Sequence, residues 1–242
     1  MVEANLPLGP FFLDDLAHQQ LLSFAKGRPK KNVPKFVTLV GPIKGGKSAV
    51  LMDVLPGMIA TNHAAAGGLK PVFFRFSFNL TQPPKEAARH LLLAAAALAN
   101  NLGFVLDVPA TIEDCLLTLS DVMGRFAKGI ADGGGELCML LDEVQVSHSC
   151  ACNPRLATTP FPLLTFPAVS WLQAPVLSAE TPTEATSFAT ALKEVFVECH
   201  PLARIAVTGS GMVTLLNTLR RVKVNGHSLW SMMTPVLLGA TL

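Results

Sequence analysis

The chain is poor in charged residues and has no tyrosine. Only 15% of its 242 residues are charged, half are apolar, and the net charge is +2. The 19 basic and 17 acidic residues are spread along the chain, so composition gives no signal for nucleic-acid binding. So few charges are typical of a parallel sheet buried on both faces. They also fit a chain with exposed apolar surface, for which a protein partner or a homo-oligomer is expected.

Features of secreted and membrane proteins are missing as well. The N-terminus has no basic stretch followed by an apolar one, so no signal peptide is expected. The longest apolar run, residues 91–98, is too short to cross a bilayer. Five cysteines, an odd number, favour a reducing compartment over a disulfide framework. We therefore expect an intracellular protein, cytoplasmic or nuclear, that does not enter a membrane.

Residues 41–48 fit the phosphate-binding pattern G-x-x-x-x-G-K-[ST]. An apolar, β-rich run precedes them at 35–40, and a helical run follows at 49–55, which is the context that the pattern requires. The glycines let successive backbone N–H groups converge on phosphate oxygens, and the helix N-terminus adds a positive field. The residues predicted to hold the nucleotide are Gly41, Pro42, Ile43, Lys44, Gly45, Gly46, Lys47, Ser48 and Ala49.

Two side chains of this segment have specific predicted roles. Lys47 can reach the β- and γ-phosphates, and the Ser48 hydroxyl can ligate Mg²⁺. The alternative is a glycine turn that matches by chance, which is expected in about 1% of chains of this length. A chance match between a strand and a helix is rarer still. The sequence thus predicts a protein that binds a nucleoside triphosphate.

Apolar strands alternate with helical segments along the chain. This alternation predicts an α/β fold, a doubly wound parallel sheet with helices on both faces. The predicted strands are 35–40, 71–78, 137–143, 204–208 and 234–238. The predicted helices that follow the second strand are 85–102, 111–131, 183–197 and a last one that ends near Arg220. Residues 1–34 form an N-terminal helical entry segment, residues 35–242 form the core, and residues 147–182 form an irregular insertion in it.

The apolar run that begins at Leu137 ends in two carboxylates, Asp142 and Glu143. Ligands of open α/β sheets bind at the carboxyl ends of the strands, where these residues would lie. Asp142 is expected to hold Mg²⁺ through a coordinating water, and Glu143 to act as general base for the attacking water. The alternative is a strand that ends in two solvated acids.

Residues 40–48 resemble a Walker A motif, and residues 137–143 resemble a Walker B motif with an adjacent catalytic glutamate. Together they are similar to the additional-strand, catalytic-glutamate branch of P-loop ATPases, especially AAA+ and STAND-type ATPases. The resemblance covers about residues 35–240 and implies ATP as the nucleotide. It also implies the strand order 5-1-4-3-2, with the strand of Thr208 between the loop strand and the strand of Asp142.

The same resemblance suggests two further site residues. Thr208, or alternatively Ser210, would be the sensor residue that contacts the γ-phosphate or the attacking water; a turn that caps the next helix is the other interpretation. Arg220, beside Arg221, holds the position of an arginine finger that acts on a neighbouring subunit's nucleotide. A solvated helix end also favours arginine. The family's C-terminal helical lid is absent after the fifth strand, so a fragment or a degenerate member is expected.

Three functions stay open. The first is a Mg²⁺-dependent ATPase, the second is a nucleotide-dependent switch or scaffold with little hydrolysis, and the third is a phosphotransferase for a small acceptor. A zinc site is disfavoured, because His148, Cys150 and Cys152 lack the spaced pairs that zinc requires. A guanine-specific GTPase is disfavoured too, because no Asn-Lys-x-Asp segment follows a strand.

Overall fold

The structure is a computed structural model that describes residues 15–27, 35–41, 45–66, 69–79, 82–144, 182–209 and 233–238. Its centre is one five-stranded sheet in which every pair of neighbouring strands is parallel. The strands are β1 Phe36–Val40, β2 Lys70–Ser77, β3 Gly135–Asp142, β4 Ala203–Thr208 and β5 Thr234–Leu237. All five predicted strands are therefore present, and the prediction of an α/β fold with a parallel sheet is confirmed.

The strands lie side by side in the order β2-β3-β4-β1-β5, which is β5-β1-β4-β3-β2 when it is counted from the other edge. In the register of β1 and β4, Leu39 is paired with Thr208. On the other side of β4, Leu141 of β3 is paired with Val207. Therefore β4 separates the strand that precedes the phosphate-binding segment from the strand that ends in Asp142.

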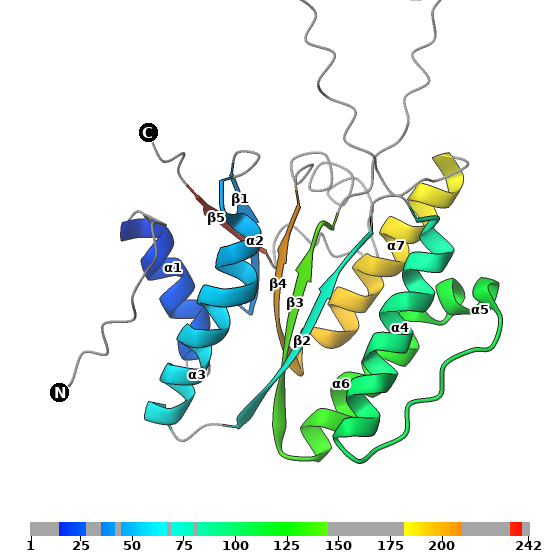
Figure 1. Ribbon diagram of the computed structural model, residues 1–242, viewed down its shortest axis with the longest axis horizontal. Coiled ribbons are helices and arrows are strands. Elements are labelled where there is room, and N and C mark those ends of the chain that lie inside the picture. Colours follow the sequence, from blue (N-terminus) through cyan, green and yellow to red (C-terminus); the bar gives the residue numbers. More distant parts are fainter. Residues whose placement is uncertain are drawn as a thin grey trace, which may run out of the picture.

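Helices cover both faces of the sheet (Figure 1). One face carries α1 and the helical segment that begins at Lys47, and the other face carries the remaining helices. The elements are α1 Asp15–Lys26, α2 Lys47–Ala49, η1 Val50–Val54, α3 Leu55–Ala66, α4 Pro84–Asn101, α5 Ile112–Leu117, α6 Leu119–Asp132 and α7 Pro182–Cys199. None of the helices in the described part of the chain is both long and apolar enough to cross a membrane.

Strand β3 shows why the sequence requires helices on both faces. Its successive side chains point to opposite faces, as in any strand. Leu137, Met139 and Leu141 belong to the apolar cluster beneath α4 to α7, whereas Cys138 and Leu140 belong to the cluster beneath α1 and α3. All five are fully buried, and burying one leucine stabilises a fold by about 1.5–3 kcal/mol. A continuous apolar run is therefore the expected pattern for a strand between two helical layers.

The helical segment after the phosphate-binding residues has a π-helical turn in its first part. Helices α2, η1 and α3 follow one another without a break from Lys47 to Ala66. The N–H of Leu55 donates to the carbonyl of Val50, five residues earlier. Pro56 follows directly, and its ring would collide with the carbonyl of Met52 in a regular α-helix. The wider π turn gives the proline room.

The prediction of a single helix over residues 111–131 is wrong. The structure has two helices, α5 and α6, that are separated at Thr118. The backbone of Thr118 departs from helical angles, with φ −103° and ψ 6°, and its hydroxyl donates to the carbonyl of Asp114 at 2.7 Å. Threonine side chains compete in this way with helical hydrogen bonds. The predicted start of the first of these helices is confirmed. Thr111 caps it, since its hydroxyl accepts the N–H of Asp114, and the first turn is acidic.

Candidate functional site

The described residues of the predicted phosphate-binding segment, Gly41 and residues 45–48, lie at the carboxyl end of the sheet, after β1. Gly46 has the left-handed backbone angles φ 77° and ψ 9°, which glycine adopts without steric cost. Its carbonyl accepts the first helical hydrogen bond, from the N–H of Val50 at 2.9 Å. At Gly41 a Cβ atom would lie 2.8 Å from the Leu238 carbonyl oxygen. Both glycines are thus required by the backbone, one for its angles and one for the close approach of β5.

Lys47 is the first residue of α2, and only 7% of it is exposed. Its Nζ atom donates to the Gly41 carbonyl at 3.2 Å, so the side chain folds back toward the end of β1. Burial lowers the pKa of the ammonium group, and the carboxylates of Glu143 and Asp142 act in the opposite direction. The two carboxylates are therefore close enough to Lys47 to interact with its charge.

Asp142 ends β3, and its carboxylate is hydrogen-bonded to the hydroxyl of Ser48. The same carboxylate accepts the N–H of Glu143 at 2.8 Å through Oδ1. Burial raises the pKa of Asp142, while the hydrogen bonds from Ser48 and Glu143 act to lower it. The structure thus brings Lys47 and Ser48 of α2 close to Asp142 and Glu143 at the end of β3.

Glu143 has a strained backbone. Its φ of 52° is the only positive value of a non-glycine residue among the described residues. A residue with a Cβ atom in this region costs about 1 kcal/mol or more, and such strain is concentrated at functional sites. The turn at Glu143 lets the next residue, Val144, donate its N–H to the Thr208 carbonyl at 2.9 Å. The position of Glu143 is therefore fixed through β4 as well as through β3.

Thr208 is fully buried, and its hydroxyl donates to the Leu39 carbonyl at 3.1 Å. The residue lies at the end of β4, where the sensor was predicted, but this hydroxyl is directed to the backbone of β1. Its carbonyl binds the N–H that follows Glu143. Thr208 thus links the strand of the phosphate-binding segment to the turn of the acidic pair.

Several predicted site residues lie outside the described part of the chain. They are Pro42, Ile43, Lys44, Ser210, Arg220 and Arg221, together with His148, Cys150 and Cys152 of the zinc alternative and nearly all of the predicted insertion. Of the described residues, none form a group of three or more His, Cys, Asp or Glu that could hold a metal.

Sequence reasoning missed one buried ion pair. It lies at the amino ends of the strands, opposite the carboxyl ends where the candidate site is. Arg204 and Glu136 are both within strands, and Arg204 Nη2 lies 2.5 Å from Glu136 Oε2. The signal was available, because an arginine and a glutamate interrupt the apolar runs of β4 and β3 near their first residues. Charged residues are almost never buried unless they are paired, so the two could have been matched.

Comparison with known proteins gives no relative on which a function could be based. No family model, no curated protein and no solved structure matches this chain. The residues of the site itself are therefore the basis for its function.

Proposed function

We propose that this protein binds ATP with Mg²⁺ at the carboxyl edge of the sheet and hydrolyses it. The observation that carries the proposal is the meeting of four side chains from two distant segments. Lys47 and Ser48 are the first residues of α2, after β1, whereas Asp142 ends β3 and Glu143 follows it. Ser48 is hydrogen-bonded to Asp142, and Lys47 interacts with both acids. Hydrolysis of a triphosphate requires these groups in one place, namely a cation for the phosphates, oxygen ligands for a metal and a base.

The donor set fits magnesium. Ser48 and Asp142 offer a hydroxyl and a carboxylate that already touch each other. Mg²⁺ prefers oxygen ligands and is commonly bound by one or two protein groups together with phosphate oxygens and water. When bound, it would neutralise phosphate charge and help to orient the triphosphate. We assign Ser48 as a direct ligand and Asp142 as the residue that holds the metal through water.

The remaining groups have roles that follow from their positions. Lys47 would exchange the Gly41 carbonyl for β- and γ-phosphate oxygens, which are stronger partners because they are charged. Glu143 would take the proton of a water molecule that attacks the terminal phosphorus, as the bond to the bridging oxygen breaks and ADP leaves. Thr208 is a positioning residue in this scheme, because its hydroxyl is hydrogen-bonded to the backbone of β1.

The proposal also draws on the resemblance of the same motif residues to the additional-strand, catalytic-glutamate branch of P-loop ATPases. In that branch the strand of the sensor lies between the strands of the two motifs, and β4 lies between β1 and β3 here. The choice of adenine rests on the resemblance and on the lack of an Asn-Lys-x-Asp segment after a strand in the sequence. The trans-acting role of Arg220 in a homo-oligomer rests on the resemblance alone.

Nucleotide binding and phosphate release test the proposal. Lys47→Ala should abolish binding of a fluorescent ATP analogue, while Lys128→Ala, at an exposed lysine of α6, should bind as the wild type does. Glu143→Gln should keep binding and lower the rate of phosphate release by about 100-fold or more, as expected for loss of a general base. The exposed Glu113→Gln is its matched control and should leave the rate unchanged.

The outcomes separate the three functions. Binding that Lys47→Ala removes, without phosphate release, would identify a nucleotide-dependent switch or scaffold and reject hydrolysis. ATP consumption only after addition of a small acceptor would identify a phosphotransferase. Binding that is the same for the wild type and Lys47→Ala would overturn the nucleotide site itself.

A further inference from the structure

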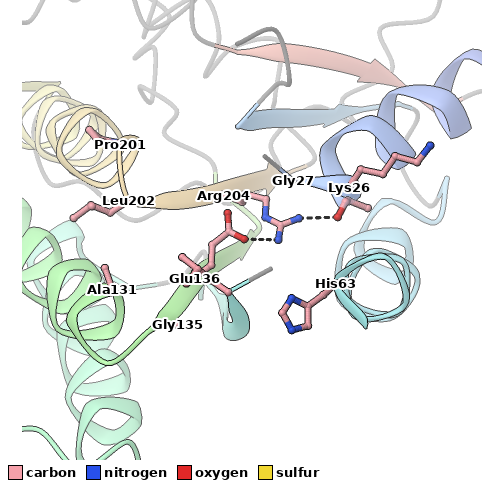
Figure 2. Close-up of a pocket in the computed structure, with 11 residues that line it drawn as sticks. Lys26, Gly27, His63, Ala131, Gly135, Glu136, Pro201, Leu202 and Arg204 are labelled. Carbon is pink, nitrogen blue, oxygen red and sulfur yellow. Dashed lines mark hydrogen bonds and ion pairs between the residues drawn. The ribbon is translucent and has the colours of Figure 1, made fainter. Parts of the chain in front are cut away.

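A pocket of about 290 Å³ lies at the amino end of the sheet (Figure 2). The candidate nucleotide site is at the opposite, carboxyl end of the strands. Its walls come from the ends of α1, α3 and α6 and from the first residues of β3 and β4. Six of the lining residues carry the argument, namely Gly27, His63, Ala131, Glu136, Leu202 and Arg204. The volume is near the lower end of the range of about 300–1,000 Å³ for ligand pockets. An occupant would therefore be a small molecule.

One wall of the pocket is the buried ion pair. Arg204 is only 4% exposed, and its Nη2 atom is bound to Glu136 Oε2 (Figure 2). Its Nη1 atom donates to the carbonyls of Phe24 and Ala25 in the last turn of α1. Gly27 has φ 62°, and a Cβ atom there would lie 3.1 Å from the Arg204 guanidinium carbon. The end of α1 is thus shaped to admit this arginine.

These contacts leave part of the pair unused. Arg204 has five N–H groups; two at Nη1 and one at Nη2 have partners, and Nε has none. Glu136 uses Oε2 only, and none of the described residues donates to its Oε1. The side chain of Glu136 is 17% exposed, compared with 5% for Arg204, so the carboxylate is the more accessible member. Because Nε is buried, the second N–H of Nη2 is the donor that remains for a ligand. The pair thus offers an acceptor, Glu136 Oε1, beside this donor, and it has no net charge.

The charges of the pair select among small ligands. A carboxylate attracted to Arg204 would also lie beside Glu136, and an ammonium group attracted to Glu136 would also lie beside Arg204. Either charged ligand would therefore meet a like charge at low dielectric. A primary carboxamide carries an N–H donor beside a carbonyl acceptor and is neutral, so it satisfies both members. The rest of the lining includes Leu69, Ala131 and Leu202, which suit a short aliphatic group. We propose that this pocket binds a small neutral molecule with a primary carboxamide on a short aliphatic body.

The pocket lies at the far ends of the elements that carry the nucleotide site. Strand β3 joins Glu136 to Asp142, β4 joins Arg204 to Thr208, and the helical segment from Lys47 to Ala66 contains His63 in its last turn. The carboxamide site nevertheless stands apart from the proposed ATPase, because its binding is measured without nucleotide. Failure of either proposal would leave the other intact.

Three near-isosteric probes test the ligand class, namely isobutyramide, isobutyrate and isobutylamine. Each is titrated into the ¹⁵N-labelled full chain, and the backbone amide shifts of Gly135 and Glu136 are followed. We expect saturable shifts with isobutyramide at about millimolar concentration, as for a ligand of six heavy atoms. The acid and the amine should bind at least about tenfold more weakly, which corresponds to about 1.4 kcal/mol.

A pocket-filling variant provides the second arm. Ala131→Leu places a larger side chain in the pocket without touching the ion pair and should weaken isobutyramide binding by about tenfold or more. Ala97→Leu, at an exposed position of α4, is the matched control and should bind as the wild type does. No saturable shift, equal binding of the three probes, or binding that Ala131→Leu leaves unchanged would each overturn the proposal.

Discussion

The hydroxyl of Ser48 is hydrogen-bonded to the carboxylate of Asp142, although Ser48 lies in α2, after β1, and Asp142 ends β3. This contact is possible because β4 is the only strand between β1 and β3, so the carboxyl ends of the two motif strands are near each other. It places a hydroxyl and a carboxylate at one point of the sheet edge. The proposed magnesium site depends on this pair.

Substitution of Ser48 should separate metal binding from phosphate binding. Ser48→Ala removes the hydroxyl, so the gain in ATP affinity on addition of Mg²⁺ should fall by about tenfold, the equivalent of one charge-assisted contact. Ser48→Thr keeps a hydroxyl on the same carbon and should retain most of the gain. Titration of a fluorescent ATP analogue with Mg²⁺ and with EDTA measures it. Equal magnesium dependence in the wild type and Ser48→Ala would contradict the assignment of Ser48 as a ligand.

Asp142 should lower the stability of the chain at neutral pH. Burial raises its folded-state pKa, because the charged form is disfavoured inside the fold. The protonated form therefore contributes its full stability below the unfolded-state pKa, and this contribution is lost as the pH rises through the folded-state pKa. Asp142→Asn keeps an oxygen acceptor for Ser48 without the charge. Its Tm at pH 7 should be about 2–4 °C above that of the wild type, which corresponds to roughly 1 kcal/mol for a chain of this size.

The pH dependence of this difference provides the control. As the pH falls below the raised pKa of Asp142, the wild-type carboxyl becomes neutral, and the two Tm values should converge. Thermal unfolding followed by circular dichroism between pH 4 and pH 8, in buffers without nucleotide, measures both curves. A difference that stays constant over this range would mean that the charge of Asp142 is not its cause.

Two glycines should respond to alanine in opposite directions. At Gly41 a Cβ atom would meet the Leu238 carbonyl at 2.8 Å, beside the hydrogen bond from the Leu238 N–H to the Val40 carbonyl. Gly41→Ala should therefore destabilise the fold by about 1–3 kcal/mol through displacement of β5. Gly124, in α6, has its nearest neighbour at 3.7 Å, the Cβ of Glu198. Gly124→Ala should stabilise by about 0.5–1 kcal/mol, and urea unfolding distinguishes the two.

Thr208 should act through the backbone of β1. Thr208→Val removes the hydroxyl that donates to Leu39 and should lower the free energy of unfolding by about 1 kcal/mol, whereas Thr208→Ser should keep the hydrogen bond. If Thr208 positions the site, ATP hydrolysis should fall in Thr208→Val and recover in Thr208→Ser. A loss of hydrolysis in Thr208→Val with unchanged stability would instead indicate direct contact with the nucleotide.

Much of the secondary structure could be predicted because its signals are local. Apolar runs flanked by turn residues located all five strands to within two residues at either end. The break between α5 and α6 was missed, because the hydrogen bond of the Thr118 hydroxyl to Asp114 competes with helical propensity. The π-helical turn before Pro56 was missed as well, although the proline is a local reason for it.

The sequence by itself determined the alternation of buried strands and helices and the place of the two motif segments at the ends of β1 and β3, because these depend on neighbours in the chain. Only the tertiary structure decided that Ser48 meets Asp142, that the Thr208 hydroxyl turns to Leu39, and that Arg204 pairs with Glu136. Each of these contacts joins segments that are far apart in sequence. The sheet register fixes them, and register follows from burial of the whole apolar core rather than from any single residue.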